Sequence, residues 1–197
     1  MARIGVLGLQ GAVEEHVRSI AAAGHEGLVV KLPHQLADVD GLIIPGGEST
    51  AIRKLMDQFG FIEEIQSFSA LKKPIFGTCA GMVLLAGTLA AADDVHLGLM
   101  DITVERNAFG RQKDSFEVEL EIEGLLDPFP AVFIRAPYIV ESGSQTEVLA
   151  VHDGRTVMAR QGHLLACSFH PELTEDHGVL LLFLEMVEQS LQAAITK

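Results

Sequence analysis

Residues 74–89, PIFGTCAGMVLLAGTL, decide the fold because they combine a strand pattern, a turn bracketed by glycines and a helix pattern. Residues 74–77 form a short apolar run, typical of a strand buried inside a sheet. Residues 82–89 are apolar and predict a helix. Between them, GTCAG (residues 77–81) follows the pattern G-x-nucleophile-x-G of a sharp strand-to-helix turn, with Cys79 in the place of serine.

The first half of the chain repeats this alternation of strand and helix. Apolar runs predict strands at residues 3–9, 28–32 and 41–44, and helical spacing predicts helices at 12–23, after an N-cap at Ser49, and at 61–68. Alternating strands and helices indicate an α/β fold, a three-layer open, mostly parallel sheet with helices on both faces.

The second half is richer in strand patterns. Short strand-like runs lie at residues 99–104, 116–122, 132–134, 148–151, 156–160 and 164–169, and Gly178–Ile195 has the apolar stripe of a closing amphipathic helix. Because no linker separates the halves, we expect one domain over residues 1–197, with the extra strands added to one sheet.

Composition excludes several classes of protein. The 197 residues include 27 acidic and 14 Lys or Arg side chains, a net charge of −13, which argues against nucleic acid and anionic membranes as partners. No run of about 18 uninterrupted apolar residues, the length expected of a transmembrane helix, is present. The N-terminal residues lack the pattern of a signal peptide. Two cysteines are too few for a disulfide scaffold, so we expect a protein of the reducing cytoplasm.

Cys79 is the candidate nucleophile. A strand-to-helix turn places its sulfur at a helix N-terminus, where the helix dipole and free N–H groups favour a thiolate and can stabilise an oxyanion. The alternative is a small buried apolar side chain. Cys167 lies in an apolar run without flanking glycines and is predicted to be such a core residue.

His170-Pro171-Glu172 supplies the candidate base. It follows a predicted strand, and Pro171 stiffens the backbone so that Glu172 can orient the imidazole of His170, as in a catalytic triad. A surface turn is the alternative. The remaining histidines have no comparable partner and are interpreted mostly as surface or helix-end residues: His16, His25, His34, His96, His152, His163 and His177. No metal-binding motif is present, so we expect neither a metal nor a cofactor.

Pro45-Gly46-Gly47-Glu48-Ser49-Thr50 follows the third predicted strand. Two glycines there allow the backbone to approach a ligand and to aim an N–H group at it. The alternative is an ordinary turn with Ser49 as the helix cap, whereas a phosphate loop is disfavoured because its lysine spacing is absent.

These features resemble the class I, triad-type glutamine amidotransferases, a flavodoxin-like fold, and more narrowly the glutaminase subunits of pyridoxal 5′-phosphate synthases. Many amidotransferases carry Gln two residues after the second glycine of the turn, where this chain has Val83, which fits the vitamin B6 branch. The matching segments are residues 8–11, 41–50, 77–82, 106–112, 114–117, 133–137 and 168–173.

The resemblance implies a role for each matching residue. Cys79 attacks the side-chain amide of L-glutamine, His170 transfers the proton, and Glu172 orients His170. The oxyanion donors are the N–H groups of Gly47 and Ala80. The implied substrate-binding residues are Gly46, Gly47, Glu48, Ser49, Arg106, Ile134 and Arg135.

The resemblance also implies a partner. Gln10 lies in a loop that meets the synthase subunit in this family, so we expect a hetero-oligomer in which ammonia passes to the synthase. Two other enzymes remain open, a deglycase-like cysteine hydrolase on the same fold and the glutaminase subunit of another biosynthetic amidotransferase. A third alternative is a non-catalytic assembly subunit.

Overall fold

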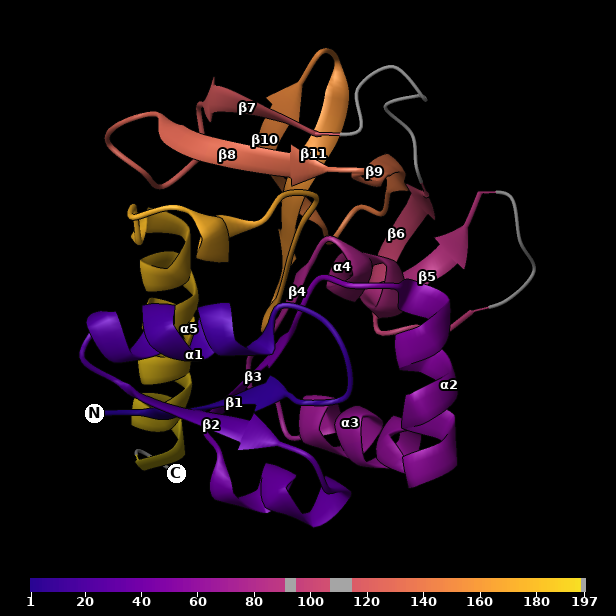
Figure 1. Ribbon diagram of the computed structural model, residues 1–197, viewed down its shortest axis with the longest axis vertical. Helices are drawn as coiled ribbons and strands as arrows, with labels where there is room; N and C mark the ends of the chain where they lie inside the picture. Colours follow the sequence, from indigo (N-terminus) through magenta and orange to yellow (C-terminus); the bar gives the residue numbers. More distant parts are fainter. Residues whose placement is uncertain (91–94, 107–114, 196–197) are drawn as a thin grey trace.

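The computed structural model describes residues 1–90, 95–106 and 115–195, and most of its strands form one sheet (Figure 1). The strands of this sheet are β1 (Arg3–Leu7), β2 (Glu26–Val30), β3 (Gly41–Ile44), β4 (Ile75–Thr78), β5 (Ala86–Leu89), β6 (Met100–Glu105), β9 (Tyr138–Ser142), β10 (Glu147–His152), β11 (Arg155–Gln161) and β12 (Leu164–Cys167). Their order is β2-β1-β3-β4-β12-β11-β9-β6-β5, and β10 pairs with β11.

Strands β2, β1, β3, β4 and β12 pair in parallel, whereas β11, β9 and β10 join antiparallel. Parallel strands end at the same edge of a sheet, which is where open α/β folds build their sites. The loops after β1, β3, β4 and β12 therefore meet at one edge, and they carry Gln10, Gly46, Cys79 and His170.

Helices cover both faces of the sheet. They are α1 (Val13–Ala22), α2 (Ser49–Phe59), α3 (Phe61–Ala70), α4 (Ala80–Leu85) and α5 (Gly178–Ile195), with short 3-10 helices η1 (Pro33–Asp38) and η2 (Pro171–Leu173). One apolar core lies under α2, α3 and α4, and a second lies under α1 and α5 (Figure 1). This arrangement confirms the predicted three-layer α/β fold.

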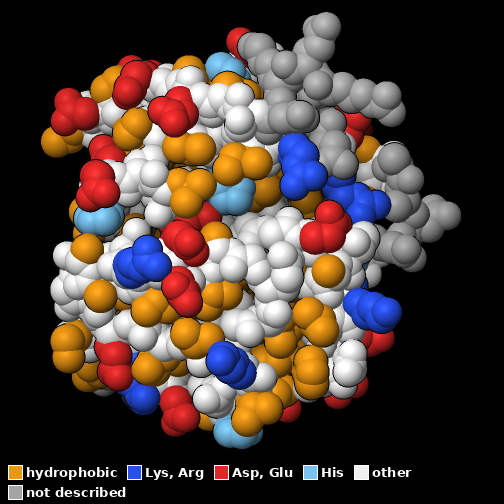
Figure 2. Space-filling view, viewed as in Figure 1, with side chains coloured by type: hydrophobic (Ala, Val, Ile, Leu, Met, Phe, Trp, Pro, Cys, Tyr) orange, Lys and Arg blue, Asp and Glu red, His pale blue; other side chains and the backbone are white. Residues whose placement is uncertain are grey.

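A separate antiparallel hairpin, β7 (Ser115–Leu120) and β8 (Phe129–Ile134), packs on the second core. Its outer side is acidic, and Figure 2 shows red side chains gathered over it. Its inner side carries Phe129 and Phe133, which pack against Phe169 just before His170. The hairpin therefore supports the segment that carries the candidate base.

Helix α5 is the one described helix that is long and apolar enough to cross a membrane by length and composition, with a mean hydropathy of 1.4. Its inner stripe, including Val179, Phe183 and Val187, is fully buried in the second core, and Glu185 and Glu188 interrupt its apolar sequence. We assign α5 to the core because that stripe packs against the sheet.

Several sequence-based boundaries were wrong. The helix predicted at residues 82–89 ends at Leu85, and residues 86–89 form β5 because they pair with β6. A short apolar run does not distinguish a buried helix from a buried strand.

Two further features differ from the prediction. Strand β9 was missed, and the N-cap of α2 is Glu48 rather than Ser49, because the carboxylate of Glu48 accepts from the N–H of Thr50. Residues 107–112 and 114 of the resemblance lie outside the described residues.

Candidate active site

Cys79 lies on a strained turn between β4 and α4. Its φ of 49° and ψ of −104° are unusual for a residue with a side chain, a conformation that costs on the order of 1–3 kcal/mol. Its N–H donates to the carbonyl oxygen of Cys167, at 2.8 Å. The flanking glycines are required, because a Cβ at Gly81 would lie 2.0 Å from the carbonyl oxygen of Ile44 and one at Gly77 would lie 2.5 Å from the Gly81 backbone.

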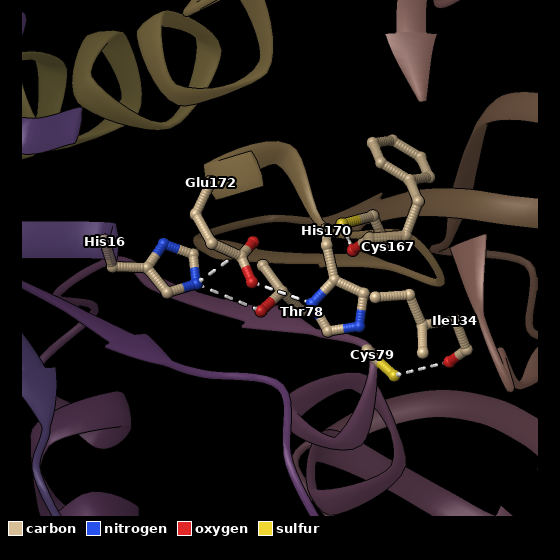
Figure 3. Close-up of polar contacts among 8 residues, drawn as sticks. His16, Thr78, Cys79, Ile134, Cys167, His170 and Glu172 are labelled. Atoms are coloured by element: carbon tan, nitrogen blue, oxygen red, sulfur yellow. Dashed lines mark hydrogen bonds and ion pairs between the residues drawn. The ribbon is translucent and has the colours of Figure 1, made fainter. Parts of the chain in front are cut away.

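His170 and Glu172 form a buried pair beside Cys79 (Figure 3). The N–H of His170 donates to the carbonyl oxygen of Val132, and its Nδ1 lies 2.7 Å from Glu172 Oε1. The other ring nitrogen is turned toward Cys79 (Figure 3). The sulfur of Cys79 therefore lies beside the imidazole of His170 and the carboxylate of Glu172, although Cys79 is far from both in the chain.

The surroundings of His170 stabilise its protonated form. Burial by itself lowers the pKa of His170, but hydrogen bonds and negative charge from Cys79 and Glu172 outweigh burial and raise the pKa to about 10. Burial raises the pKa of Glu172, and His16 and His170 outweigh it, so that the pKa of this carboxyl falls below its ordinary value. The pair is therefore built to hold a proton on the imidazole.

A pocket of about 110 Å³ opens beside the sulfur of Cys79. It brings together most of the residues that the sequence pointed to, since its lining consists of Gly47, Glu48, Ser49, Cys79, Ala80, Val83, Arg106, Arg135 and Pro137. Ile134 does not line the pocket, but its carbonyl oxygen lies 3.9 Å from the sulfur. A larger groove of about 550 Å³ lies between residues 121–125 and 148–151, and it shares no lining residue with the pocket beside Cys79.

The Gly46-Gly47 peptide is held from the side of β1. The carbonyl oxygen of Gly46 accepts from the N–H of Ala12, and Gln10 Oε1 accepts from the N–H of Glu48, at 2.9 Å. In a trans peptide the N–H points opposite to the carbonyl, so the Gly47 N–H points away from Ala12. A Cβ at Gly46 would lie 2.4 Å from the ring of His170, which explains the need for glycine.

Two arginines bring positive charge to the pocket. Arg106 and Arg135 are exposed and both line it. Arg135 has a φ of 43°, a second strained position at the same site. A guanidinium group forms paired hydrogen bonds with a carboxylate, so this rim suits a substrate that carries one.

The prediction that His16 is a surface or helix-end residue was wrong. Its ring is buried on α1, with Nε2 3.2 Å from Thr78 Oγ1 and 3.5 Å from Glu172 Oε2. His16 shares the inward face of the helix with Val13, Val17 and Ile20, and that periodicity was the signal that could have found it.

Within residues 1–90, 95–106 and 115–195, no group of three His, Cys, Asp or Glu side chains is arranged to hold a metal ion. The site combines a cysteine on a strained turn, a buried His–Glu pair and two arginines at the pocket. The described residues of the site therefore suit acyl transfer through a cysteine.

Two solved structures are similar to this chain over nearly its whole length. A crystal structure described as a glutamine amidotransferase superimposes with a TM-score of 0.89 at 44% identity, over 94% of this chain and 98% of the other. The structure of PurLQS from Thermotoga maritima, 17% identical, shares the fold with a TM-score of 0.69, over 99% of this chain and 100% of the other. Fold and similarity together define a class I glutamine amidotransferase.

Sequence similarity narrows this class. Residues 6–189 match the SNO glutamine amidotransferase family, and the chain belongs to that family. Pyridoxal 5′-phosphate synthase subunit PdxT from Bacillus licheniformis is 57% identical over 99% of this chain and its own full length. The protein of the same name from Geobacillus sp. (strain WCH70) is 62% identical over 96% of this chain and 99% of its own.

Proposed function

We propose that the protein is the glutaminase subunit of a pyridoxal 5′-phosphate synthase and hydrolyses L-glutamine to L-glutamate and ammonia. The names and near full-length similarity of the relatives support this function. The observation that carries it is the buried His170–Glu172 pair, joined at 2.7 Å, beside a cysteine on a strained turn.

The first half of the reaction forms an acyl-enzyme. His170 takes the thiol proton of Cys79 and holds it while Cys79 Sγ attacks the side-chain carbonyl carbon of glutamine. The carbonyl oxygen becomes an oxyanion, stabilised by the N–H groups of Gly47 and Ala80. The C–N bond then breaks, His170 gives its proton to the leaving nitrogen, and ammonia departs from a γ-glutamyl thioester on Cys79.

The second half returns the enzyme to its starting state. Water attacks the thioester carbonyl, and His170 takes a proton from that water. The C–S bond breaks, the sulfur of Cys79 regains the proton, and glutamate is released. Glu172 keeps His170 in one tautomer throughout, because its carboxylate accepts from Nδ1 and leaves the other nitrogen for proton transfer.

Substrate binding is assigned to the pocket beside the sulfur. Arg106 and Arg135 face the α-carboxylate, since their charge matches it. Gly46, Gly47, Glu48, Ser49 and Ile134 complete the binding residues. Val83 and Pro137 also line the pocket and are added to the set that the sequence indicated.

The physiological partner is a synthase subunit that consumes the ammonia, and the proposed location is the cytoplasm. Ammonia released into water is protonated and loses its nucleophilicity, so direct transfer between two sites is an advantage. Gln10 is assigned to the interface with the synthase. Its contact with the N–H of Glu48 links that interface to the oxyanion loop, so docking of the synthase is expected to raise glutaminase activity.

The test is glutamate release from L-glutamine by the purified chain, alone and mixed with the synthase subunit of a close relative. We expect little glutamate from the chain alone and a strong increase on mixing. Mass spectrometry of the peptide that contains Cys79 should detect a γ-glutamyl adduct after acid quenching. Absence of glutamate in the mixture would disprove the function, and equal rates with and without the synthase would disprove activation.

A further inference from the structure

Glu172 faces two imidazoles, of which the triad uses one. Oε1 lies 2.7 Å from Nδ1 of His170, and Oε2 lies 3.5 Å from Nε2 of His16 (Figure 3). The side chain of Glu172 is fully buried and that of His16 is 3% exposed. In the described part of the chain, Oε2 has no hydrogen bond within the usual geometric limits, so His16 is the group placed to satisfy it.

The position of His16 is fixed by the fold. It projects from α1 toward η2, and its Nε2 also lies 3.2 Å from Oγ1 of Thr78, the residue that ends β4 just before Cys79. One imidazole therefore lies between the strand that carries the nucleophile and the carboxylate of the triad. His16 does not line the substrate pocket.

Burial of His16 favours its neutral form. Burial lowers the pKa of His16, and the positive charge of His170 acts in the same direction, while Glu172 and Glu15 oppose them with a smaller combined effect. A neutral ring has one N–H, and the carboxylate keeps its negative charge for His170. A cation at this position would compete with His170 for that charge.

We propose that His16 is a positioning residue of the glutaminase reaction, donating from Nε2–H to Oε2 of Glu172 so that Oε1 stays aimed at Nδ1 of His170. This inference rests on the proposed function. Without this donor, the carboxylate can rotate about its side chain or recruit water, and its bond to His170 weakens. Loss of this donor is expected to lower kcat and to leave KM unchanged, because His16 does not line the substrate pocket.

The experiment compares His16→Leu, His16→Asn and His16→Gln in the complex with the synthase. The amide nitrogen of Gln reaches about as far from the backbone as Nε2 of His, whereas that of Asn is shorter. We expect kcat to fall about tenfold or more in the Leu and Asn variants at an unchanged KM, and Gln to restore it to within about threefold of wild type.

His163→Gln is the matched control. His163 is partly buried and, like His16, lies within hydrogen-bonding distance of a hydroxyl, Ser69 Oγ at 2.8 Å, but it lies away from the triad. We expect its substitution to lower the free energy of unfolding without changing kcat or the pH profile. A loss in His16→Leu beyond that in His163→Gln, at equal folded fraction, then reports on the triad.

The pH profile separates positioning from mere structural support. A misaimed Glu172 raises the pKa of His170 less, so in His16→Leu the alkaline limb of kcat/KM is expected to move to lower pH by about one unit. NMR titration of His170 in the isolated chain should show the same shift without requiring turnover. The control should show neither shift.

Three results would overturn the inference: equal kcat for Gln and Asn variants, an unchanged titration of His170 in the folded Asn or Leu variant, or a loss that His163→Gln reproduces. If wild type releases no glutamate with the synthase, the proposed function fails, and the NMR titration alone still decides whether His16 orients the Glu172–His170 pair.

Discussion

The two cysteines occupy the ends of neighbouring strands, yet their surroundings differ completely. Thr78 of β4 pairs with Cys167 of β12, and the N–H of Cys79 donates to the carbonyl oxygen of Cys167. Cys167 remains in the extended strand and is fully buried, whereas Cys79 has turned out of its strand with a φ of 49°. The core cysteine thus pairs with Thr78, and the proposed nucleophile is the next residue in the chain.

The difference indicates that backbone geometry, rather than residue type, sets the proposed nucleophile apart from a core cysteine. Burial raises the pKa of Cys167 well above its ordinary value, so its thiol stays protonated and donates weakly to the carbonyl oxygen of Phe169. Cys79 instead lies at the start of α4, beside His170 and a pocket. Gly77 and Gly81 permit that turn because no side chain fits at either position.

The largest expected effect is on activity. Cys79→Ala should reduce glutamate release by the complex by roughly 10⁴-fold or more, because the nucleophile is lost. Cys167→Ala should remain within about threefold of wild type, since its sulfur only fills space in the core. A folded Cys167→Ala variant without activity, or an active Cys79→Ala variant, would remove the contrast between the cysteines.

Alkylation tests the same contrast without turnover. Iodoacetamide should modify Cys79 about 10³-fold faster than Cys167, because the buried thiol reacts only after the structure opens. Peptide mass spectrometry at increasing times measures both rates in one sample. Adding glutamine should protect Cys79 only, and comparable rates in the native chain would contradict the assignment of Cys167 to the core.

Substitution of a glycine tests the turn itself. Gly81→Ala should lower the free energy of unfolding by about 3 kcal/mol or prevent folding, because its Cβ would lie 2.0 Å from a backbone oxygen. Gly154→Ala is the control, since its φ is 71° and no atom lies within 4 Å of an added Cβ. We expect that change to cost only about 1 kcal/mol in urea unfolding. Equal losses would show that the close approach at Gly81 is relieved by relaxation.

The sequence predicted the turn and the His170–Glu172 pair because each is set by neighbouring residues. Gly77 and Gly81 bracket Cys79 within five positions, and Pro171 separates the paired residues. Their meeting in space followed from the parallel strands, whose ends share one edge of the sheet. The fold class was likewise predictable from the alternation of strands and helices.

What the sequence did not reveal depends on pairing between distant segments. Residues 86–89 are apolar enough for a helix, and only their pairing with β6 makes them a strand. Strand β9 contains Glu141 and Ser142 and is formed because β6 and β11 lie on either side. His16 resembled a surface residue because its partners, Thr78 and Glu172, lie 62 and 156 positions away.

The smallest effect expected is a change in the pH dependence of stability. A folded-state pKa of about 10 for His170, against 6.5 when unfolded, stabilises the protein fully below pH 6.5, and that contribution is lost as pH rises through 10. Between pH 6.5 and 8.5 the free energy of unfolding should therefore fall, by at most about 1.4 kcal/mol per unit. Cys79→Ala removes a group that raises this pKa and should make the slope shallower, whereas Cys167→Ala should leave it unchanged. Urea titrations at four pH values measure the slopes, and a parallel change in both variants would show that the sulfur of Cys79 is not coupled to His170.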